Sequence, residues 1–444
     1  MIPVLAMLVL FPGLPELPAS WELGVFALDA ETGEVLIDIN GTVPFRPAST
    51  VKAVTTLAAL EHLGAAYLYN TSIAADTSSG SLYLIGSGAP LLSAEDVTRT
   101  AIETAAALPG RNGWNLFLDP SAIASETHLP GWDESDWDRT YCPPVEPLCI
   151  GDNVLEIVVS AVDGPLRVYT YPPLPSLVVN TGQLRTGSST SITATGGNWE
   201  TGSPELTLSG TIEAGTREII YKPFAGAPLE LALYLEGELN RYGVPAVFGG
   251  VRLEEGGASV PGVTSTMYSD PLWVILGTMN KWSRNMVAEQ VLRTVAFHVT
   301  GEPGSTRAGC DVSGALLDSI CPGIQGWQLA DGSGLSRLNM LAPEQLARVF
   351  LEGWSSLSYG PEFMASFPAS GTDGTLAARM NGIPPGAFRG KTGSLNDTCT
   401  IAGILTTENG RKVALAVFIQ MPRGHIWRAR SWQDGYIEEL YRSL

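Results

Sequence analysis

The stretch FRPASTVKAVTTLAALEHLG, residues 45–64, combines a helical pattern with a pair of reactive side chains. Its apolar residues recur at helical spacing, which predicts a helix that begins near Ser49 and stops at Gly64. Ser49 and Lys52 are three residues apart, so a helix would place both side chains on one face, about one turn apart. The amine of Lys52 could then reach the hydroxyl of Ser49.

This pair is suited to nucleophilic catalysis. A serine hydroxyl is a poor nucleophile until a base removes its proton. A lysine can be that base if burial and nearby positive charge keep its amine neutral. The positive end of the helix would also stabilise charge on Ser49. Because Ser-x-x-Lys occurs in many surface helices, the motif by itself indicates little.

Two further triplets add polar groups of the right kind. In SRN, at a predicted break between two helices, Ser283 could relay a proton and the Asn285 amide could donate and accept hydrogen bonds. In KTG, before an apolar strand, Lys391 and Thr392 could bind a carboxylate. Gly393 would let an extended substrate approach the strand edge.

Length and charge limit the class of protein. With 444 residues the chain should form two or three domains. Its formal net charge of -19 argues against nucleic acid as a partner and gives no reason to expect an anionic membrane surface. The apolar run 1–11 is too short to span a bilayer and resembles the core of a secretory signal. We therefore predict a signal segment at 1–20 and an exported protein, periplasmic or extracellular, with a buried first strand as the alternative.

The cysteines and histidines bear on disulfides and metals. Two local pairs, Cys142 with Cys149 and Cys310 with Cys321, suit disulfides in an oxidising compartment, whereas Cys399 falls in an apolar strand pattern. The four histidines are scattered, with no His-x-x-x-His, so we expect no metal site and no cofactor.

The three motifs, in this order, resemble those of the active-site-serine penicillin-recognising enzymes. Other segments are similar to one branch, the D-alanyl-D-alanine carboxypeptidase/endopeptidase family typified by penicillin-binding protein 4 (peptidase family S13). The chain departs from the usual pattern at Arg284, where the family often has Asp. The similar segments are PGW at 130–132, DGSGLSR at 331–337, GTDGTL at 371–376 and GKTGSL at 390–395.

The resemblance implies an α+β fold with nested domains. A transpeptidase/β-lactamase-like catalytic domain, helices packed on an antiparallel sheet, would comprise residues 21–64 and 266–444. A mixed domain II, residues 65–160 and 216–265, would be inserted in it. Domain II would itself carry a small all-β domain III at 161–215, where the sequence is rich in Thr, Ser, Gly and Pro with β-branched alternation.

The resemblance also implies a function. The chain would be a serine-type D-Ala-D-Ala carboxypeptidase acting on peptidoglycan stem peptides, with endopeptidase activity left open, and β-lactams would inhibit it covalently. Ser49 would form the acyl-enzyme with Lys52 as general base, and Ser283 and Asn285 would lie opposite.

The substrate-binding residues follow from the same resemblance. Lys391 and Thr392 would bind the terminal carboxylate beside Gly393. The backbone N–H groups of Ser49 and Ser394 would form the oxyanion hole. The pocket for the stem side chain would be lined by Arg337, Asp136 and Asn396.

Two other functions fit parts of the pattern. A β-lactamase or esterase on the same fold would need a base that activates water, and we find no recognisable glutamate motif for one. A non-catalytic cell-wall-binding protein would be expected to have lost Ser49, Lys52 or Lys391, and all three are present. A lipase-type hydrolase is disfavoured because no Gly-x-Ser-x-Gly occurs.

Overall fold

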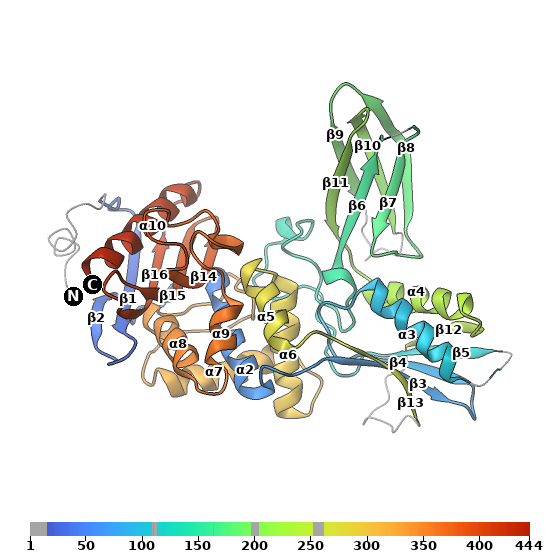
Figure 1. The fold of residues 1–444 in the computed structure, drawn as a ribbon, viewed down its shortest axis with the longest axis horizontal. Helices are drawn as coiled ribbons and strands as arrows, with labels where there is room; N and C mark the ends of the chain where they lie inside the picture. Colours follow the sequence, from blue (N-terminus) through green and yellow to red (C-terminus); the bar gives the residue numbers. More distant parts are fainter. Residues whose placement is uncertain (1–15, 109, 111–112, 163, 197–203, 252–261) are drawn as a thin grey trace. The chain divides into compact units, whose positions relative to one another are not determined.

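The computed structural model describes residues 16–108, 110, 113–162, 164–196, 204–251 and 262–444. Most of the predicted signal segment, residues 1–15, lies outside the described residues. The chain divides into two compact units, which Figure 1 shows as ribbons. The first holds the described residues up to Tyr67 together with Leu129–Trp132 and Asp270–Leu444. The second holds Leu68–His128 and Asp133–Ser269.

A five-stranded antiparallel sheet, in the order β14-β15-β16-β1-β2, forms the centre of the first unit. The predicted hairpin at 21–40 is confirmed, since β1 and β2 pair antiparallel. Strand β16 is buried along almost its whole length because side chains of one face pack on helix α10 and α8 contacts the sheet as well. The strands are Glu22–Asp29 (β1), Val35–Ile39 (β2), Phe388–Leu395 (β14), Thr398–Thr406 (β15) and Lys412–Gln420 (β16).

Helix α2 is the buried centre of the helical part of this unit. Every residue from Lys52 to Leu60 is buried, because α5, α6, α7 and α8 all contact α2. No helix in the described part of the chain is long and apolar enough to cross a membrane. The helices are Lys52–Leu63 (α2), Leu272–Lys281 (α5), Asn285–Thr300 (α6), Thr306–Ile320 (α7), Pro343–Ser355 (α8), Gly360–Ser366 (α9) and Ile426–Ser443 (α10).

The second unit is built on a mixed five-stranded sheet in the order β12-β5-β4-β3-β13. Helix α3 begins with a capping box, in which Ser93 and Asp96 satisfy each other's backbone N–H groups. The elements are Asn70–Asp76 (β3), Ser81–Ile85 (β4), Ala94–Ala107 (α3), Trp114–Asp119 (β5), Ala227–Arg241 (α4), Ala246–Val251 (β12) and Val263–Tyr268 (β13).

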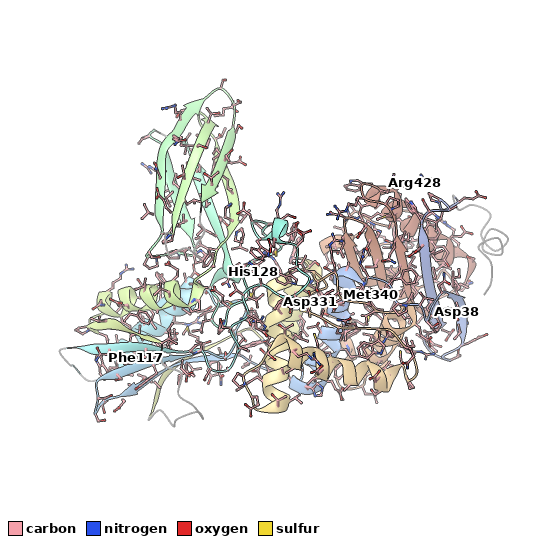
Figure 2. The ribbon with its side chains drawn as sticks, turned by 180° about the vertical axis from the view of Figure 1, so that it is seen from behind. Asp38, Phe117, His128, Asp331, Met340 and Arg428 are labelled. Atoms are coloured by element: carbon pink, nitrogen blue, oxygen red, sulfur yellow. The ribbon has the colours of Figure 1, made fainter. Side chains whose placement is uncertain are left out.

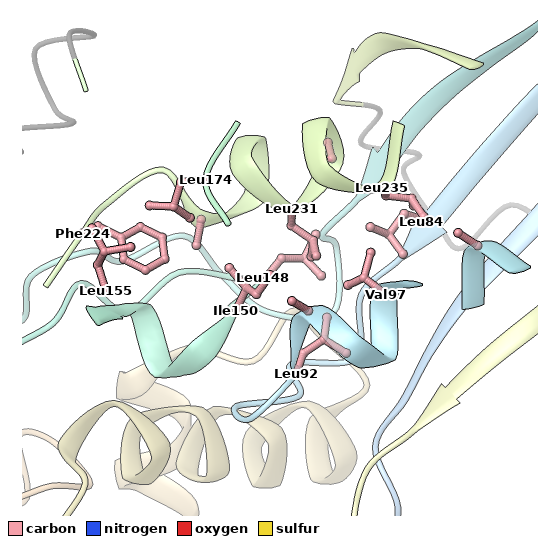
Figure 3. Close-up of a cluster of buried hydrophobic side chains, with 14 of the residues drawn as sticks. Leu84, Leu92, Val97, Leu148, Ile150, Leu155, Leu174, Phe224, Leu231 and Leu235 are labelled. Atoms are coloured by element: carbon pink, nitrogen blue, oxygen red, sulfur yellow. The ribbon is translucent and has the colours of Figure 1, made fainter. Parts of the chain in front are cut away.

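Two three-stranded sheets complete the second unit, in the orders β8-β10-β9 and β11-β6-β7. Strands β6 and β11 lie outside the expected range 161–215, yet they pair with each other along their length. Figure 3 shows why these sheets belong with the helices: Leu155 and Phe224 share one buried cluster with Leu231 of α4. The strands are Val154–Ser160 (β6), Arg167–Tyr171 (β7), Val178–Gly187 (β8), Ser191–Gly196 (β9), Glu205–Glu213 (β10) and Arg217–Pro223 (β11).

Candidate active site

The predicted pair of Ser49 and Lys52 lies where a short 3-10 turn, Ala48–Val51, leads into α2. Lys52 Nζ is 3.3 Å from Ser49 Oγ, so the proximity predicted from their spacing is confirmed. The helix ends at Gly64, also as predicted, where a positive φ of 80° suits glycine. The turn delays the start of the α-helix to Lys52, which leaves the Ser49 side chain partly exposed.

Three oxygen atoms surround the amine of Lys52. Besides Ser49 Oγ, Nζ donates to Asn285 Oδ1 and to the carbonyl of Ser333, each at 2.6 Å. The amide and backbone carbonyls can only accept, so each requires one N–H of the amine. A neutral amine has two N–H groups and one lone pair, and with both N–H groups engaged its lone pair faces the Ser49 hydroxyl. This arrangement fits a lysine that takes a proton from Ser49.

The electrostatics of Lys52 favour the neutral form near neutral pH. The residue is fully buried, and burial lowers its pKa to about 7, against a partial upward effect of Asp331 and Glu289. Since the amine is uncharged above its pKa, a substantial fraction of Lys52 can act as a base at pH 7.

The other two motifs meet beside this pair. Ser283 lies at the break between α5 and α6, and this break confirms the prediction from the sequence. The backbone of Ser283 has a positive φ of 58°. Lys391 Nζ, from β14, lies 3.1 Å from Ser283 Oγ and donates to the carbonyl of Thr392 at 2.8 Å. Burial and the neighbouring Lys52 hold the pKa of Lys391 well below its usual value. The Thr392 hydroxyl bonds to that of Thr375 at 2.9 Å.

Gly393 explains why β14 can pass so close to the nucleophile. A Cβ at this position would lie 2.8 Å from the carbonyl oxygen of Pro47 and 2.9 Å from the backbone nitrogen of Ser49. It would also lie 2.2 Å from Thr400 Oγ1, so there is no room for a side chain. The backbone of β14 therefore runs directly beside the amide of Ser49.

Glu289 is a site residue that sequence reasoning missed. It lies on α6 four residues after Asn285, and it is fully buried. Its carboxylate accepts the N–H of Ser333 at 2.8 Å and that of Gly332 at 3.1 Å. A charged residue four positions after Asn285 shares its helix face, which was the available signal.

Asp331, labelled in Figure 2, lies in the loop between α7 and α8 and is also buried. Its two oxygens accept hydrogen bonds from the N–H groups of Gly334 and Ser336 at 2.7 and 2.6 Å. Trp132 Nε1 donates to it at 2.9 Å. The segment resembling the family at 331–337 is thus folded around this one carboxylate.

Asp373, from the GTDGTL segment, has structural partners. It forms an ion pair with Lys281 at 2.9 Å and accepts the N–H of Ala369 at 2.8 Å. Its contacts fix the start of the loop that carries Thr375. Arg284, where the family often has Asp, is exposed at the N-terminal end of α6. This departure from the family pattern therefore concerns a surface residue.

Of the residues expected around the stem side chain, Arg337 faces a partner that the sequence analysis did not single out. Its Nη1 lies 3.3 Å from Asp397, which also binds Arg46 at 3.1 Å. Asn396 is exposed in the turn between β14 and β15. Ser394 is exposed in β14, and its Oγ accepts a hydrogen bond from Arg430 at 3.1 Å.

Asp136 lies in the second compact unit, within the 3-10 turn Glu134–Asp136. Its carboxylate accepts a hydrogen bond from the hydroxyl of Tyr141 at 2.6 Å. Burial and, to a smaller extent, this contact raise the pKa of Tyr141 to about 12. The expected joint pocket of Asp136 and Arg337 therefore stays a prediction.

All five cysteines lie in the described part of the chain, where each is buried and no disulfide joins any two of them. The predicted Cys310–Cys321 bridge is wrong for this fold. The two residues lie near opposite ends of α7, about 16 Å apart at the helical rise, whereas a disulfide needs Cα atoms within about 7 Å. Their close spacing in sequence was misleading because a helix, not a loop, separates them. Cys142 and Cys149 lie in irregular structure, and no bond joins them either.

The first unit therefore brings the three motifs into one site. A nucleophile and lysine at the start of a buried helix lie against a Ser-x-Asn turn, beside a Lys-Thr-Gly strand at the edge of an antiparallel sheet. This fold and site define an active-site-serine enzyme of the penicillin-recognising class.

Comparison with known proteins identifies the branch. The profile of the D-Ala-D-Ala carboxypeptidase 3 (S13) family matches residues 13–429, so the chain belongs to that family. A D-alanyl-D-alanine carboxypeptidase of an Actinomadura species is 28% identical over 411 residues, which cover 87% of this chain and 76% of that protein. The D-alanyl-D-alanine carboxypeptidase DacB of Haemophilus influenzae is 26% identical over 434 residues, or 91% of this chain and 86% of the relative.

A solved structure supports the expected α+β fold. The crystal structure of penicillin-binding protein 4 (dacB) from Haemophilus influenzae is similar with a TM-score of 0.79 at 23% identity, covering 100% of both chains. The expected fold class is thereby confirmed. The chain is a serine-type D-Ala-D-Ala carboxypeptidase that acts on peptidoglycan.

Proposed function

We propose that Ser49 carries the acyl group and that neutral Lys52 is the base that activates it. The observation that carries this proposal is the pair of carbonyl oxygens at 2.6 Å from Nζ, which engage both N–H groups of a neutral amine. The remaining lone pair is then directed to the Ser49 hydroxyl. The low pKa of Lys52 supports the same role.

In acylation, Ser49 Oγ attacks the carbonyl carbon of the penultimate D-Ala as its proton passes to Lys52 Nζ. The C–N bond to the terminal D-Ala breaks, and the leaving amine takes up the proton that Lys52 received. Ser283, whose hydroxyl is 3.1 Å from Lys391 Nζ, is suited to relay it by giving its own proton to the amine and taking the one from Lys52 in return. Water then attacks the acyl carbon: its hydroxyl stays on the carbon, the bond from Ser49 Oγ to the acyl group breaks, and its other proton returns to Ser49 by way of Lys52.

The substrate would lie along β14. The backbone N–H groups of Ser49 and Ser394 are proposed to bind the developing oxyanion. Gly393 leaves the strand open to a substrate backbone. Lys391 and Thr392 would bind the terminal carboxylate, whose opposite charge would raise the pKa of Lys391 from its lowered value and favour the charged amine.

Specificity is proposed to come from residues around this strand. Arg337 and Asp136 would bind the charged end of the stem side chain, and Asn396 would line the same pocket. The ion pair of Arg337 with Asp397 supports a second candidate role, in which Arg337 holds the framework of the site.

We also propose that the protein is exported, because residues 1–11 form an apolar run and its substrate class lies in the cell wall. A Cys142–Cys149 disulfide stays part of that proposal. We further infer that strands β6–β11 constitute the small third domain and that β3–β5, α3, α4, β12 and β13 constitute the second.

The direct test of the proposed chemistry is release of D-Ala from a diacyl-D-Ala-D-Ala peptide. The wild-type chain should release it, and Ser49→Ala should not. Thr372→Ala, which removes a hydroxyl bonded at 3.2 Å to the carbonyl of Ser370 in the same unit, is the control and should retain activity. Full activity of Ser49→Ala would mean that the nucleophile lies elsewhere.

A further inference from the structure

Two carboxylates that the proposed chemistry does not use lie buried beside Lys52. Glu289 comes from α6, and Asp331 comes from the loop between α7 and α8. Their exposed fractions are 0% and 1%. Carboxylates are almost never fully buried unless they are paired, so their partners indicate what they do.

The partner that links Asp331 to the base is a single peptide group. The N–H of Gly334 donates to Asp331 at 2.7 Å. The carbonyl of the same peptide group, that of Ser333, accepts from Lys52 Nζ at 2.6 Å. Asp331 and Lys52 are therefore joined through one peptide group.

Glu289 is joined in the same way to helix α2 through the preceding peptide group, which links Gly332 to Ser333. The N–H of Ser333 donates to Glu289 at 2.8 Å, and the carbonyl of Gly332 accepts from the hydroxyl of Thr55 at 2.8 Å. Both peptide groups thus span from a carboxylate on one side to helix α2 on the other. Hydrogen bonds in such chains polarise one another. Each acidic side chain therefore makes the carbonyl oxygen on the α2 side of its peptide group a stronger hydrogen-bond acceptor.

Gly334 keeps this strip of backbone against the nucleophile. Its φ is +83°, and a Cβ there would lie 1.9 Å from the carbonyl oxygen of Ala48. The backbone at Gly334 therefore packs directly on Ala48, the residue that precedes Ser49. A shift of the strip would move the Ser333 carbonyl and, with it, the amine of Lys52.

The two carboxylates also act on Lys52 by charge. Burial lowers the lysine pKa, whereas Asp331 and, to a smaller extent, Glu289 raise it. Burial, aided by the charge of Asp331, raises the pKa of Glu289 to about 8. The other titratable or charged groups in this buried cluster are Arg293 of α6, which lowers the pKa of Glu289, Cys310 of α7 and Lys391 of β14.

We propose that Glu289 and Asp331 are positioning residues for the base, acting on Lys52 through the backbone of residues 332–334. They fix where its N–H groups point, and the charge of Asp331 raises the Lys52 pKa and so keeps the amine from losing its proton at too low a pH. This inference rests on the proposed role of Lys52 as the base for Ser49.

The test is the rate constant for acylation by penicillin, measured against pH for the full chain and its variants. Glu289→Gln keeps the size of the side chain and removes its charge, whereas Glu289→Asp keeps the charge but is one methylene shorter. Because the pKa of Glu289 is raised to about 8, its side chain is largely uncharged on the acid limb, so we expect both variants to leave the limb near its wild-type position. Both should lower the rate per folded molecule at every pH, because neither can accept the N–H groups of Gly332 and Ser333 as Glu289 does.

Asp331→Asn should shift the acid limb to lower pH, by on the order of one pH unit, because the charge of Asp331 raises the pKa of Lys52. If that variant does not fold, the two Glu289 variants still decide the matter. The control is Asp434→Asn, which breaks the ion pair with Arg379 at 2.8 Å within the same unit. It should lower the thermal midpoint without moving the pH profile.

Three outcomes separate the possibilities. Folded Glu289 variants with the wild-type rate and acid limb would overturn the inference and leave the role of Lys52 intact. A loss of rate in the Glu289 variants that only follows a loss of folded protein, with an unmoved limb in folded Asp331→Asn, would reduce both residues to a structural role and also contradict the inference. A wild-type chain that penicillin does not acylate would overturn the proposed function itself and the inference with it.

Discussion

Lys52 Nζ and Asn285 Oδ1 lie 2.6 Å apart, although the two residues are 233 positions apart in the chain. This hydrogen bond joins the first two motifs and directs one N–H of the amine away from Ser49. With the Ser333 carbonyl engaging the second N–H, the only remaining direction for a lone pair is toward the nucleophile. The catalytic competence of Ser49 should therefore depend on residues of three separate segments.

Removal of the base should abolish most of the acylation. We expect Lys52→Ala to lower the rate constant for acylation by roughly 10²–10⁴-fold, the usual effect of losing a general base. The control is Lys412→Ala at the start of β16, whose amine donates to the hydroxyl of Thr406 at the end of β15 at 2.7 Å. Stopped-flow acylation with a fluorescent penicillin measures both. Wild-type kinetics for Lys52→Ala would place the base elsewhere.

The rate of acylation should rise with pH through about 7. The pKa of Lys52 is lowered to about 7, so the amine is protonated and inactive below that pH and neutral above it. We expect the rate to fall by about tenfold for each pH unit once the pH is well below the pKa. A pH profile measured between 5 and 9, with folding monitored by circular dichroism, checks this. A flat profile over that range would contradict a titrating Lys52 base.

A methyl group at Gly393 should disrupt the site. The Cβ of Gly393→Ala would lie within 3 Å of Pro47, Ser49 and Thr400 atoms, so β14 would have to move away from the nucleophile. We expect a severe loss of acylation together with a lower thermal midpoint. The control Gly237→Ala, in helix α4 with nothing near its Cβ, should be neutral or stabilising by up to about 1 kcal/mol. An active, stable Gly393→Ala would contradict the close approach.

Arg337 should select the stem side chain. We expect Arg337→Ala to lower kcat/KM roughly tenfold or more for a stem peptide with its full diamino acid, and to leave a simple diacyl-D-Ala-D-Ala almost unaffected. Arg46→Ala is the control, because Arg46 shares the Asp397 partner at 3.1 Å. Equal losses on both substrates would assign Arg337 to the framework of the site through its pair with Asp397.

Much of the site could be predicted from short motifs, since Ser49, Lys52, Ser283 and Lys391 have spacings and neighbours that identify them before any folding. The roles of Glu289 and Asp397 could not be predicted in this way, because the residues next to a polar side chain in the sequence do not show which distant group it will contact. Their roles arise from contacts with segments distant in the chain: Glu289 with 332–333, and Asp397 with Arg46 and Arg337.

The fold was predictable to a similar degree. The hairpin at 21–40, the helix after Ser49 and the break at Ser283 each have a local signal of spacing or turn chemistry, and all three are confirmed. The predicted Cys310–Cys321 pairing is wrong because the residues between the two cysteines form α7, so closeness in sequence does not bring them together in space. The pairing of β6 with β11, on either side of residues 161–215, is long-range and leaves no local mark in the sequence.

The most direct test of Ser49 as the nucleophile is peptide mapping by mass spectrometry after exposure of the folded chain to penicillin, followed over time. We expect one adduct per chain, located on Ser49 and persisting for many minutes, and none on Ser49→Ala. An adduct on another residue, or no adduct on folded protein, would contradict the proposed chemistry, and rapid turnover of the drug would instead indicate a β-lactamase.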